Sequence, residues 1–442
     1  MKNMMSRLKN FFFNINFLKE LMILIIIGVI IGLLIGVYQL FLTYVVGLNS
    51  FFYSSTNIYV ILGFLAIAVI LSILNFMLLS YAPGCSGSGI PSLKLANRDN
   101  SRIGWIKDIP IMFINSCNTI FLGFPLGSEG PSVVMASKIS TAVQDLTNIY
   151  DEEINELSEG VGFGCAFLSP LAGISYALEE GKRKFKFKSF LKVFLLMIIA
   201  FLITKLINHH HLLSIENVIN FDLNFFFVLI EILIINVGLG HFFIKFNTFL
   251  KKITKKYSNN FFIKYRSFFV TPIIILLSFF TINMTGAGGK IISSISTYTI
   301  ISYLVFVLLF RFLNINVAAN SNVTGGLIVP ILSLGALSGQ IINIYATRYQ
   351  NFDQSNWPIV ILISSIMLFS LIIKTPITGT ILLYSTISYL TNDYLSSLIY
   401  IPVIFIIYFI GTIFSKRILK DKCLYDELLL ENDVNNRVES EK

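Results

Sequence analysis

Charged residues are scarce in this chain. Asp, Glu, Lys and Arg make up 13% of its 442 residues, whereas soluble domains carry roughly 25%. Apolar residues make up 55%, and the mean hydropathy is +0.77. Because a water-soluble core of this length cannot hide that much apolar surface, the composition excludes an ordinary soluble domain and predicts an integral membrane protein.

Cysteine is also rare. Its four copies stand singly, at Cys85, Cys117, Cys165 and Cys423. This spacing fits neither a metal site nor a disulfide framework, so we interpret the cysteines as small packing residues. A run of three histidines at 209–211 could bind a metal, but a polar loop between helices is the better interpretation. The sequence therefore predicts no metal and no organic cofactor.

Basic residues outnumber acidic ones by 33 to 24, which gives a net charge of +9. Such an excess can indicate nucleic-acid binding. Here, however, the basic residues gather in short stretches beside apolar segments, at 182–188, 251–266 and 416–422. Short loops rich in Lys and Arg stay on the cytoplasmic side of a membrane. We therefore expect these loops and both termini in the cytoplasm, and no nucleic-acid partner.

The clearest apolar stretches approach or exceed the roughly 20 residues that span a bilayer. They are residues 21–46, 58–79, 190–207, 225–239, 269–282 and 398–414. The first is too long for the core of a signal peptide, which has about 7–15 residues. We therefore expect residues 1–20 to form a cytoplasmic or interfacial segment that leads into a retained membrane helix.

Other apolar segments are interrupted by Gly and Pro well before a full span. They lie at 86–95, 111–126, 128–142, 160–178, 325–342 and 375–390. Irregular backbone at membrane depth is tolerated only where it is buried in protein or lines a wet cavity. The broken segments, rather than the long ones, therefore predict the transport path of a secondary transporter.

Two of the broken segments recur along the chain. GSEGP at 127–131 resembles GLIVP at 326–330, and PLAG at 170–173 resembles PITG at 376–379. Both pairs are separated by about 200 residues, which indicates an internal duplication. We predict a transmembrane domain over 21–416, with a first half at about 21–207, a second half at about 222–416, and a cytoplasmic C-terminal helix and tail at 417–442. That tail is too short for a separate regulatory domain.

Three glycine-rich motifs open segments that could hold an anion: GSGIP at 87–91, GSEGP at 127–131 and GGLIVP at 325–330. Gly lets the backbone approach a ligand closely, and Pro suits a first helical turn. One helix start contributes about 0.3–2 kcal/mol to holding an anion, which does not offset the cost of dehydration. Any one motif could equally be a buried turn, but three together favour helix starts that converge on an anion.

Glu129 stands between Ser128 and Gly130 inside an apolar region. An ionisable residue is costly there and is a functional candidate by default. Its carboxylate could act as a tethered anion that competes for an anion site, and this would link its protonation to anion movement. The alternative is a glutamate that only caps a helix.

These motifs, in this order, resemble the three anion-binding signatures of the CLC family of chloride channels and proton-coupled chloride transporters. Further matches are PLAGISYALEE at 170–180, TGAGG at 285–289, TPITG at 375–379 and CLYDELL at 423–429. The resemblance covers essentially the whole chain. It implies an all-α polytopic membrane fold of two inverted-topology halves with broken helices, and a homodimer with a pore in each subunit.

The resemblance also implies roles for single residues. Glu129 matches the gating glutamate, and Glu180 matches the inner proton-transfer glutamate of exchangers. From the residues alone, Glu180 could be a solvated helix end and Tyr425 an interfacial anchor. The residues expected to bind chloride, through hydroxyl or backbone N–H groups, are Gly87, Ser88, Ser128, Gly130, Leu327, Ile328 and Tyr425.

Four positions depart from the family pattern. Ser128 replaces a basic residue that often precedes the gating glutamate, which weakens the positive field at the outer mouth of the pore. Ser92 and Lys94 stand where acids are frequent, which changes the expected inner proton route. Ile328 replaces a phenylalanine but keeps its backbone N–H group.

We therefore predict a chloride/proton antiporter, not an enzyme, in the inner membrane of a bacterium. Glu180 favours exchange over a passive chloride channel of the same fold, because a channel needs no inner proton carrier. Ser88 disfavours a fluoride/proton antiporter of this family. An intramembrane hydrolase would need a nucleophile and a base on facing helices, and the scattered serines and histidines offer no such pair.

Overall fold

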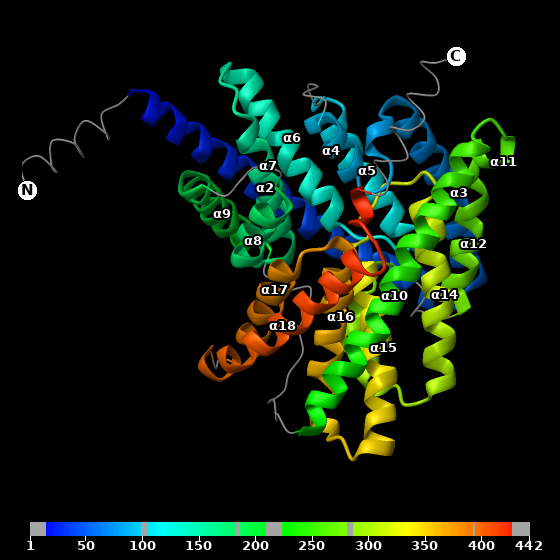
Figure 1. Ribbon diagram of the computed structural model, residues 1–442. Helices are drawn as coiled ribbons and strands as arrows, with labels where there is room; N and C mark the ends of the chain where they lie inside the picture. The colour runs from blue at the N-terminus through cyan, green and yellow to red at the C-terminus, as the bar shows by residue number, and fades with distance from the viewer. Residues whose placement is uncertain are drawn as a thin grey trace, which may run out of the picture.

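The computed structural model describes residues 15–98, 104–181, 186–208, 223–280, 286–391 and 394–426. These ranges are helical apart from the connections between helices (Figure 1). The β-type contacts within them are two isolated bridges between loops. The structure thus has the all-α architecture that the sequence predicts.

The first half of the chain contains a long N-terminal helix followed by shorter ones. Their bounds are α2 (Ile15–Ser54), α3 (Ile58–Tyr81), α4 (Ile90–Arg98), α5 (Asp108–Phe121), α6 (Glu129–Thr147), α7 (Glu152–Phe167), α8 (Pro170–Glu180) and α9 (Phe187–Ile207). Helix α7 ends where Leu168 takes a left-handed conformation, and Pro170 then opens α8. This break divides the apolar segment 160–178 as expected.

The second half repeats this alternation of long and short helices. Their bounds are α10 (Leu223–Lys256), α11 (Phe261–Lys264), α12 (Arg266–Phe280), α13 (Gly289–Ser294), α14 (Ile301–Ala319), α15 (Ile328–Gln350), α16 (Trp357–Ile373), α17 (Pro376–Thr391) and α18 (Tyr394–Arg417). Helices α15 and α17 start at the motifs that resemble those of α6 and α8. The exact boundaries of the two halves remain a prediction.

Seven helices in the described part of the chain are long and apolar enough to cross a membrane, namely α2, α3, α9, α10, α14, α15 and α16. The predicted apolar stretches fall within helices as far as the structure describes them, except that 281–282, the end of the stretch 269–282, lie outside the described residues. Helices α14 and α16 are missing from that prediction. Two helices also extend beyond the predicted stretches. Helix α2 begins at Ile15, inside the segment expected to precede the first span, and α10 continues to Lys256, well past the predicted stretch 225–239. The histidines at 209–211 lie outside the described residues.

Helices pack both on sequence neighbours and on helices distant in sequence within the same half, while contacts such as that between α8 and α17 join the halves. Helix α6 packs on α7, α15 packs on α16, and α2 packs on α9. Helix α16 is almost entirely buried. The red segment after α18 returns to the middle of the molecule in Figure 1, where it meets residues of the first half. The fold therefore places the helix breaks and the C-terminal segment around one centre.

Candidate functional site

Backbone hydrogen bonds join the loop before α4 to the loop before α15. The N–H group of Gly87 donates to the carbonyl oxygen of Val323 at 2.7 Å, and the N–H group of Gly325 donates to that of Gly87 at 2.8 Å. Gly87 has a φ of 66°, in the left-handed region that favours glycine. The first and third glycine motifs are therefore in direct contact.

The loop before α6 meets the same point. Gly127 and Gly326 exchange two backbone hydrogen bonds of 2.7 Å each. A Cβ atom on Gly130 would lie 2.8 Å from the Cβ of Ser88 and 2.9 Å from the Cα of Gly326, closer than Cβ atoms approach in proteins. All three predicted helix starts thus converge, and glycine is required because side chains would keep them apart.

The predicted anion donors lie at this convergence. Leu327 is the N-cap residue of α15 and Ile328 its first residue, so their backbone N–H groups have no partner within the helix. The buried hydroxyl oxygen of Ser88 accepts a hydrogen bond from the N–H group of Ile90 at 3.3 Å. Its proton remains free to donate elsewhere. The arrangement offers several donors and partial positive charges to a small anion.

Tyr425 approaches this region from the C-terminal segment. The ammonium of Lys94, on α4, lies 5.8 Å from the centre of the Tyr425 ring. The phenol is fully buried, and its hydroxyl has no hydrogen-bond partner among the described residues. Burial raises the pKa of this phenol, so it stays a neutral donor. Because a buried donor without a partner is costly, these contacts favour an ion-binding role over an interfacial anchor.

Glu129 is the first residue of α6 and is only 1% exposed. Its Oε1 accepts a hydrogen bond of 3.1 Å from the hydroxyl of Ser128. Backbone N–H groups at the starts of α6 and α15, including that of Val329, face the carboxyl group. Its Oε2 has no hydrogen-bond partner within the described chain. The carboxylate thus lies where two helix starts favour negative charge.

A cavity of about 290 Å³ opens beside Glu129, and we call it the Glu129 cavity. Helix α2 supplies much of its polar wall, and the Gln39 side chain donates to the Ser128 hydroxyl at 3.3 Å. Other parts of the wall are Asn208, at the end of α9, and residues 286–291, which comprise the loop before α13 and the start of that helix. Glu129 is therefore accessible to ions from one cavity although its side chain is buried.

The two adjacent glutamates at the end of α8 have different partners. The carboxylate of Glu179 accepts hydrogen bonds from the backbone N–H groups of Ile377 and Thr378 at 3.0 and 2.8 Å, and so caps the start of α17. Glu180 instead pairs with Lys94, with 2.6 Å between Nζ and Oε2. Because the Glu180 side chain is 12% exposed, it is not a solvated helix end.

A second cavity of about 660 Å³ lies beside Glu180, and we call it the Glu180 cavity. Its wall includes Lys94 and Tyr176 from the first half and residues 420–423 from the C-terminal segment. Lys94, noted as a departure from the family pattern, is the residue that links α4, Glu180 and Asp426, whose Oδ1 is 3.4 Å from Nζ. Ser92, the other departure in α4, is exposed.

Asp421 anchors the segment that carries Tyr425, a role that sequence reasoning missed. Its buried carboxylate contacts the Nδ1 atom of His241 on α10 at 2.9 Å and accepts from the hydroxyl of Ser415 at 3.0 Å. The buried ammonium of Lys374 donates to the same hydroxyl at 2.5 Å. A single acid within the basic stretch 416–422 was the available signal.

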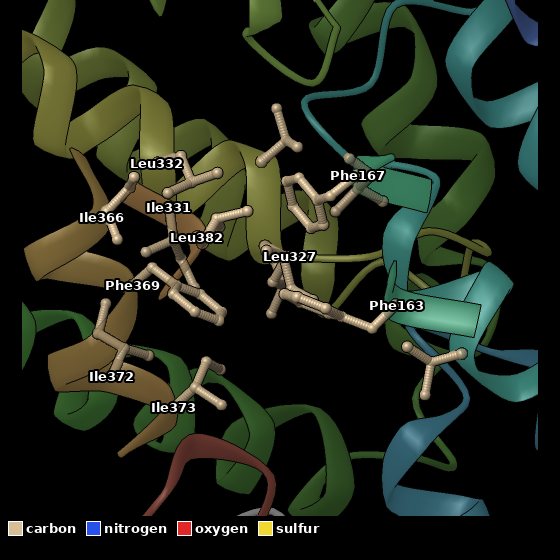
Figure 2. Close-up of a cluster of buried hydrophobic side chains, with 14 of the residues drawn as sticks. Phe163, Phe167, Leu327, Ile331, Leu332, Ile366, Phe369, Ile372, Ile373 and Leu382 are labelled. Atoms are coloured by element: carbon tan, nitrogen blue, oxygen red, sulfur yellow. The ribbon is translucent and has the colours of Figure 1, made fainter. Parts of the chain in front are cut away.

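An apolar cluster lies behind the anion donors. Figure 2 shows Phe163 and Phe167 of α7 near Leu327 at the start of α15, with side chains of α16 and α17 beside them. The ring of Phe163 stacks on Tyr176, with 4.5 Å between centroids. Such a lining keeps water away and strengthens the field of the helix starts. The four cysteines are buried and free, as predicted for packing residues.

The chain is similar to known proteins both as a family and as individual relatives. A family model described as voltage gated chloride channel matches residues 70–406. The H(+)/Cl(-) exchange transporter ClcA of Vibrio parahaemolyticus serotype O3:K6 (strain RIMD 2210633) is 26% identical over 390 residues, which cover 83% of this chain and 80% of the relative.

Solved structures resemble the fold at lower sequence identity. The crystal structure of a slow cyanobacterial Cl−/H+ antiporter aligns with a TM-score of 0.80 and 20% identity, covering 93% of this chain and 97% of that one. A CLC-type fluoride/proton antiporter aligns with a TM-score of 0.72 and 18% identity, covering 90% and 97%. These likenesses establish the same overall fold.

Proposed function

This chain is a member of the voltage-gated chloride channel (CLC) family, and on that premise we propose that it is a chloride/proton antiporter. It is an integral membrane protein whose helices converge on a single site. Exchange requires an anion site, a carboxylate that competes for that site, and a second carboxylate that passes protons to the other side. The residues for each part are present.

Chloride binds where the starts of α4 and α15 meet. The Ser88 hydroxyl and the backbone N–H groups of Leu327 and Ile328 donate to it, and Tyr425 donates from the C-terminal segment. A hydrogen bond to a charged group contributes about 1.5–3 kcal/mol, so four donors together offset much of the dehydration cost. Because these donors carry no full charge, the ion can also leave.

Glu129 couples chloride to protons, and its position is the observation that carries the proposal. Its carboxylate is buried at the starts of α6 and α15 and lines a cavity. While ionised, it occupies the anion position next to Gly130. When it takes a proton, it loses its attraction to the helix starts and yields that position to chloride. Chloride entry and protonation therefore occur together.

Glu180 passes the proton between Glu129 and the Glu180 cavity. Its ion pair with Lys94 holds the carboxylate at the wall of that cavity. The hydrogen bonds of Glu179 to α17 fix the end of α8, which positions Glu180. A passive channel would have no use for this second buried carboxylate.

The two cavities open at opposite membrane faces in this proposal, and the basic stretches support their orientation. Lys416, Lys420 and Lys422 of the basic stretch 416–422 line the Glu180 cavity, and the preference of such stretches for the cytoplasmic side supports a cytoplasmic opening. Helix α9 starts beside the basic stretch 182–188 and ends at the wall of the Glu129 cavity. Its 21 residues extend about 30 Å, the thickness of the bilayer core. The Glu129 cavity therefore opens outward.

Proton movement in liposomes tests the proposal. Purified protein is reconstituted with a chloride gradient, and the pH inside is followed while chloride efflux is measured in the same vesicles. We expect chloride to drive protons uphill. Glu129→Ala and Glu180→Gln should both abolish proton movement while chloride flux continues. Glu156→Gln, a change of the same kind in the wall of the Glu180 cavity, is the matched control.

The outcomes separate the alternatives. Chloride flux without proton movement in the unaltered protein would make it a channel and would remove the role of Glu180. Coupled movement with fluoride but not with chloride would make it a fluoride/proton antiporter. Loss of coupling in Glu156→Gln as well would show that the effect is not specific to Glu180.

We further propose a homodimer in the inner membrane of a bacterium, with both termini in the cytoplasm. In detergent, light scattering should then give a protein mass near twice the 49.8 kDa of one chain. Reporter fusions at each terminus would test the orientation. A mass of one chain, or a reporter active outside the cytoplasm, would contradict this assembly or topology.

A further inference from the structure

The outer end of the pore lacks a positive charge that the family resemblance leads one to expect. Ser128 stands directly before Glu129, where a basic residue is frequent, and its hydroxyl donates to the Glu129 carboxylate. Most other described residues that line the Glu129 cavity are neutral. Chloride arriving from outside therefore needs another source of positive potential if it is to displace a carboxylate.

Lys290 is the one cationic side chain among the described residues that line this cavity. It is the second residue of α13 and is exposed. Its Nζ atom donates a hydrogen bond of 2.6 Å to the hydroxyl of Ser50 on α2, which lines the same cavity. The hydrogen bond joins two walls of the cavity and keeps the ammonium at its mouth.

The loop before Lys290 is arranged so that its carbonyl groups repel an anion less. Arg311, fully buried on α14, donates hydrogen bonds from its guanidinium to the carbonyl oxygens of Gly286 and Ala287 at 3.0 and 2.7 Å. Both residues line the cavity. Arg311 thereby neutralises part of their negative charge from behind, while Lys290 supplies a positive charge in front.

We propose that Lys290 is the anion-capture residue of the outer cavity and takes the place of the basic residue missing at position 128. This inference rests on the proposed function, because it names the residue that draws the inorganic anion toward Glu129. An exposed positive charge at the mouth of a cavity raises the local concentration of anions, and the effect falls as salt rises.

The test compares chloride uptake through the two faces of the protein. Right-side-out and inside-out vesicles expose the Glu129 cavity and the Glu180 cavity, respectively, to the outer medium. Initial rates are measured against chloride concentration at low and high ionic strength, the latter set with an impermeant salt. The variants are Lys290→Gln, Lys290→Arg and Lys290→Glu. The matched control is Lys205→Gln. It removes a cation from the last turn of α9, near Asn208 in the wall of the Glu129 cavity, but Lys205 itself is not part of that wall.

We expect Lys290→Gln to raise the half-saturating chloride concentration about two- to fivefold at low ionic strength, as for one exposed charge. The maximal rate should not change, and the difference should shrink at high salt. Lys290→Glu should have a larger effect, whereas Lys290→Arg and Lys205→Gln should behave as the unaltered protein. The effect should appear only in right-side-out vesicles.

Two results would overturn the inference. An unchanged half-saturating concentration in Lys290→Gln and Lys290→Glu would show that the charge does not act on chloride. An equal defect at all ionic strengths, shared by Lys290→Arg, would show that the lysine only holds α13 against α2. If the unaltered protein moved no chloride from either face, the proposed function itself would fall, and this is measured separately in the same vesicles.

Discussion

A single methyl group at Gly326 should separate the three helix starts. Its Cβ atom would lie 2.6 Å from the backbone nitrogen of Gly130, and a backbone atom cannot rotate away as a side chain can. An ordinary contact would require the two chains to move apart by about 0.8 Å. Such a shift would lengthen both Gly127–Gly326 hydrogen bonds from 2.7 Å to about 3.5 Å, beyond the useful range.

The expected losses of stability and of chloride affinity follow from these contacts. Overpacking costs about 1–3 kcal/mol, and each lost hydrogen bond costs about 0.5–1.5 kcal/mol, so Gly326→Ala should lower the free energy of unfolding by about 2–6 kcal/mol. Chloride should lose at least one donor, because the Leu327 and Ile328 N–H groups move with Gly326. At about 1.5–3 kcal/mol for that donor, the dissociation constant of chloride should rise about 10- to 150-fold.

Calorimetric titration of chloride into detergent-solubilised protein measures the dissociation constant, and thermal unfolding measures the stability. Gly63→Ala is the matched control, because Gly63 lies within α3 and a Cβ there would meet nothing within 4 Å. It should bind chloride normally. If folded Gly326→Ala bound chloride within twofold of the unaltered protein, the convergence of the helix starts would not form the anion site.

Other changes test the residues around the site. Lys94→Met should leave Glu180 without its cation and lower the number of protons moved per chloride. Lys94→Arg should keep that number at the value of the unaltered protein, and the same number in both variants would contradict a role for this ion pair. Asp421→Asn should lower the melting temperature, because Ser415 and His241 lose a charged partner, at a cost of about 1.5–3 kcal/mol, and should speed proteolysis after α18; an unchanged digestion rate would argue against the anchor. Tyr425→Phe should weaken chloride binding by about 1.5–3 kcal/mol, the value of a hydrogen bond to an ion, with little loss of stability; unchanged affinity in titrations would exclude the phenol as a donor.

Much of the fold could be predicted from local sequence, because a helix that spans the bilayer needs a long apolar run and because Gly and Pro mark where helices break. Long apolar runs predicted α2, α3 and α9, and Gly and Pro predicted where α6, α8, α15 and α17 begin. Helix α14 was not predicted because Arg311, Asn314 and Asn316 interrupt its apolar pattern. Arg311 and Asn316 have partners on distant segments. Asn316, for example, accepts a hydrogen bond from Asn247 of α10. Helix α16 is apolar throughout and could have been found.

The sequence by itself determined the class of protein, the positions of the helix breaks and the identity of the candidate carboxylates. Only the tertiary structure decided which groups those carboxylates contact. Neighbouring glutamates at 179 and 180 differ because one reaches the start of α17 and the other reaches Lys94. Likewise, Lys290 lines the Glu129 cavity because α13 packs on α15 and brings its ammonium within hydrogen-bond distance of Ser50 on α2. Partners far apart in sequence leave no local pattern, since their pairing depends on how whole helices pack.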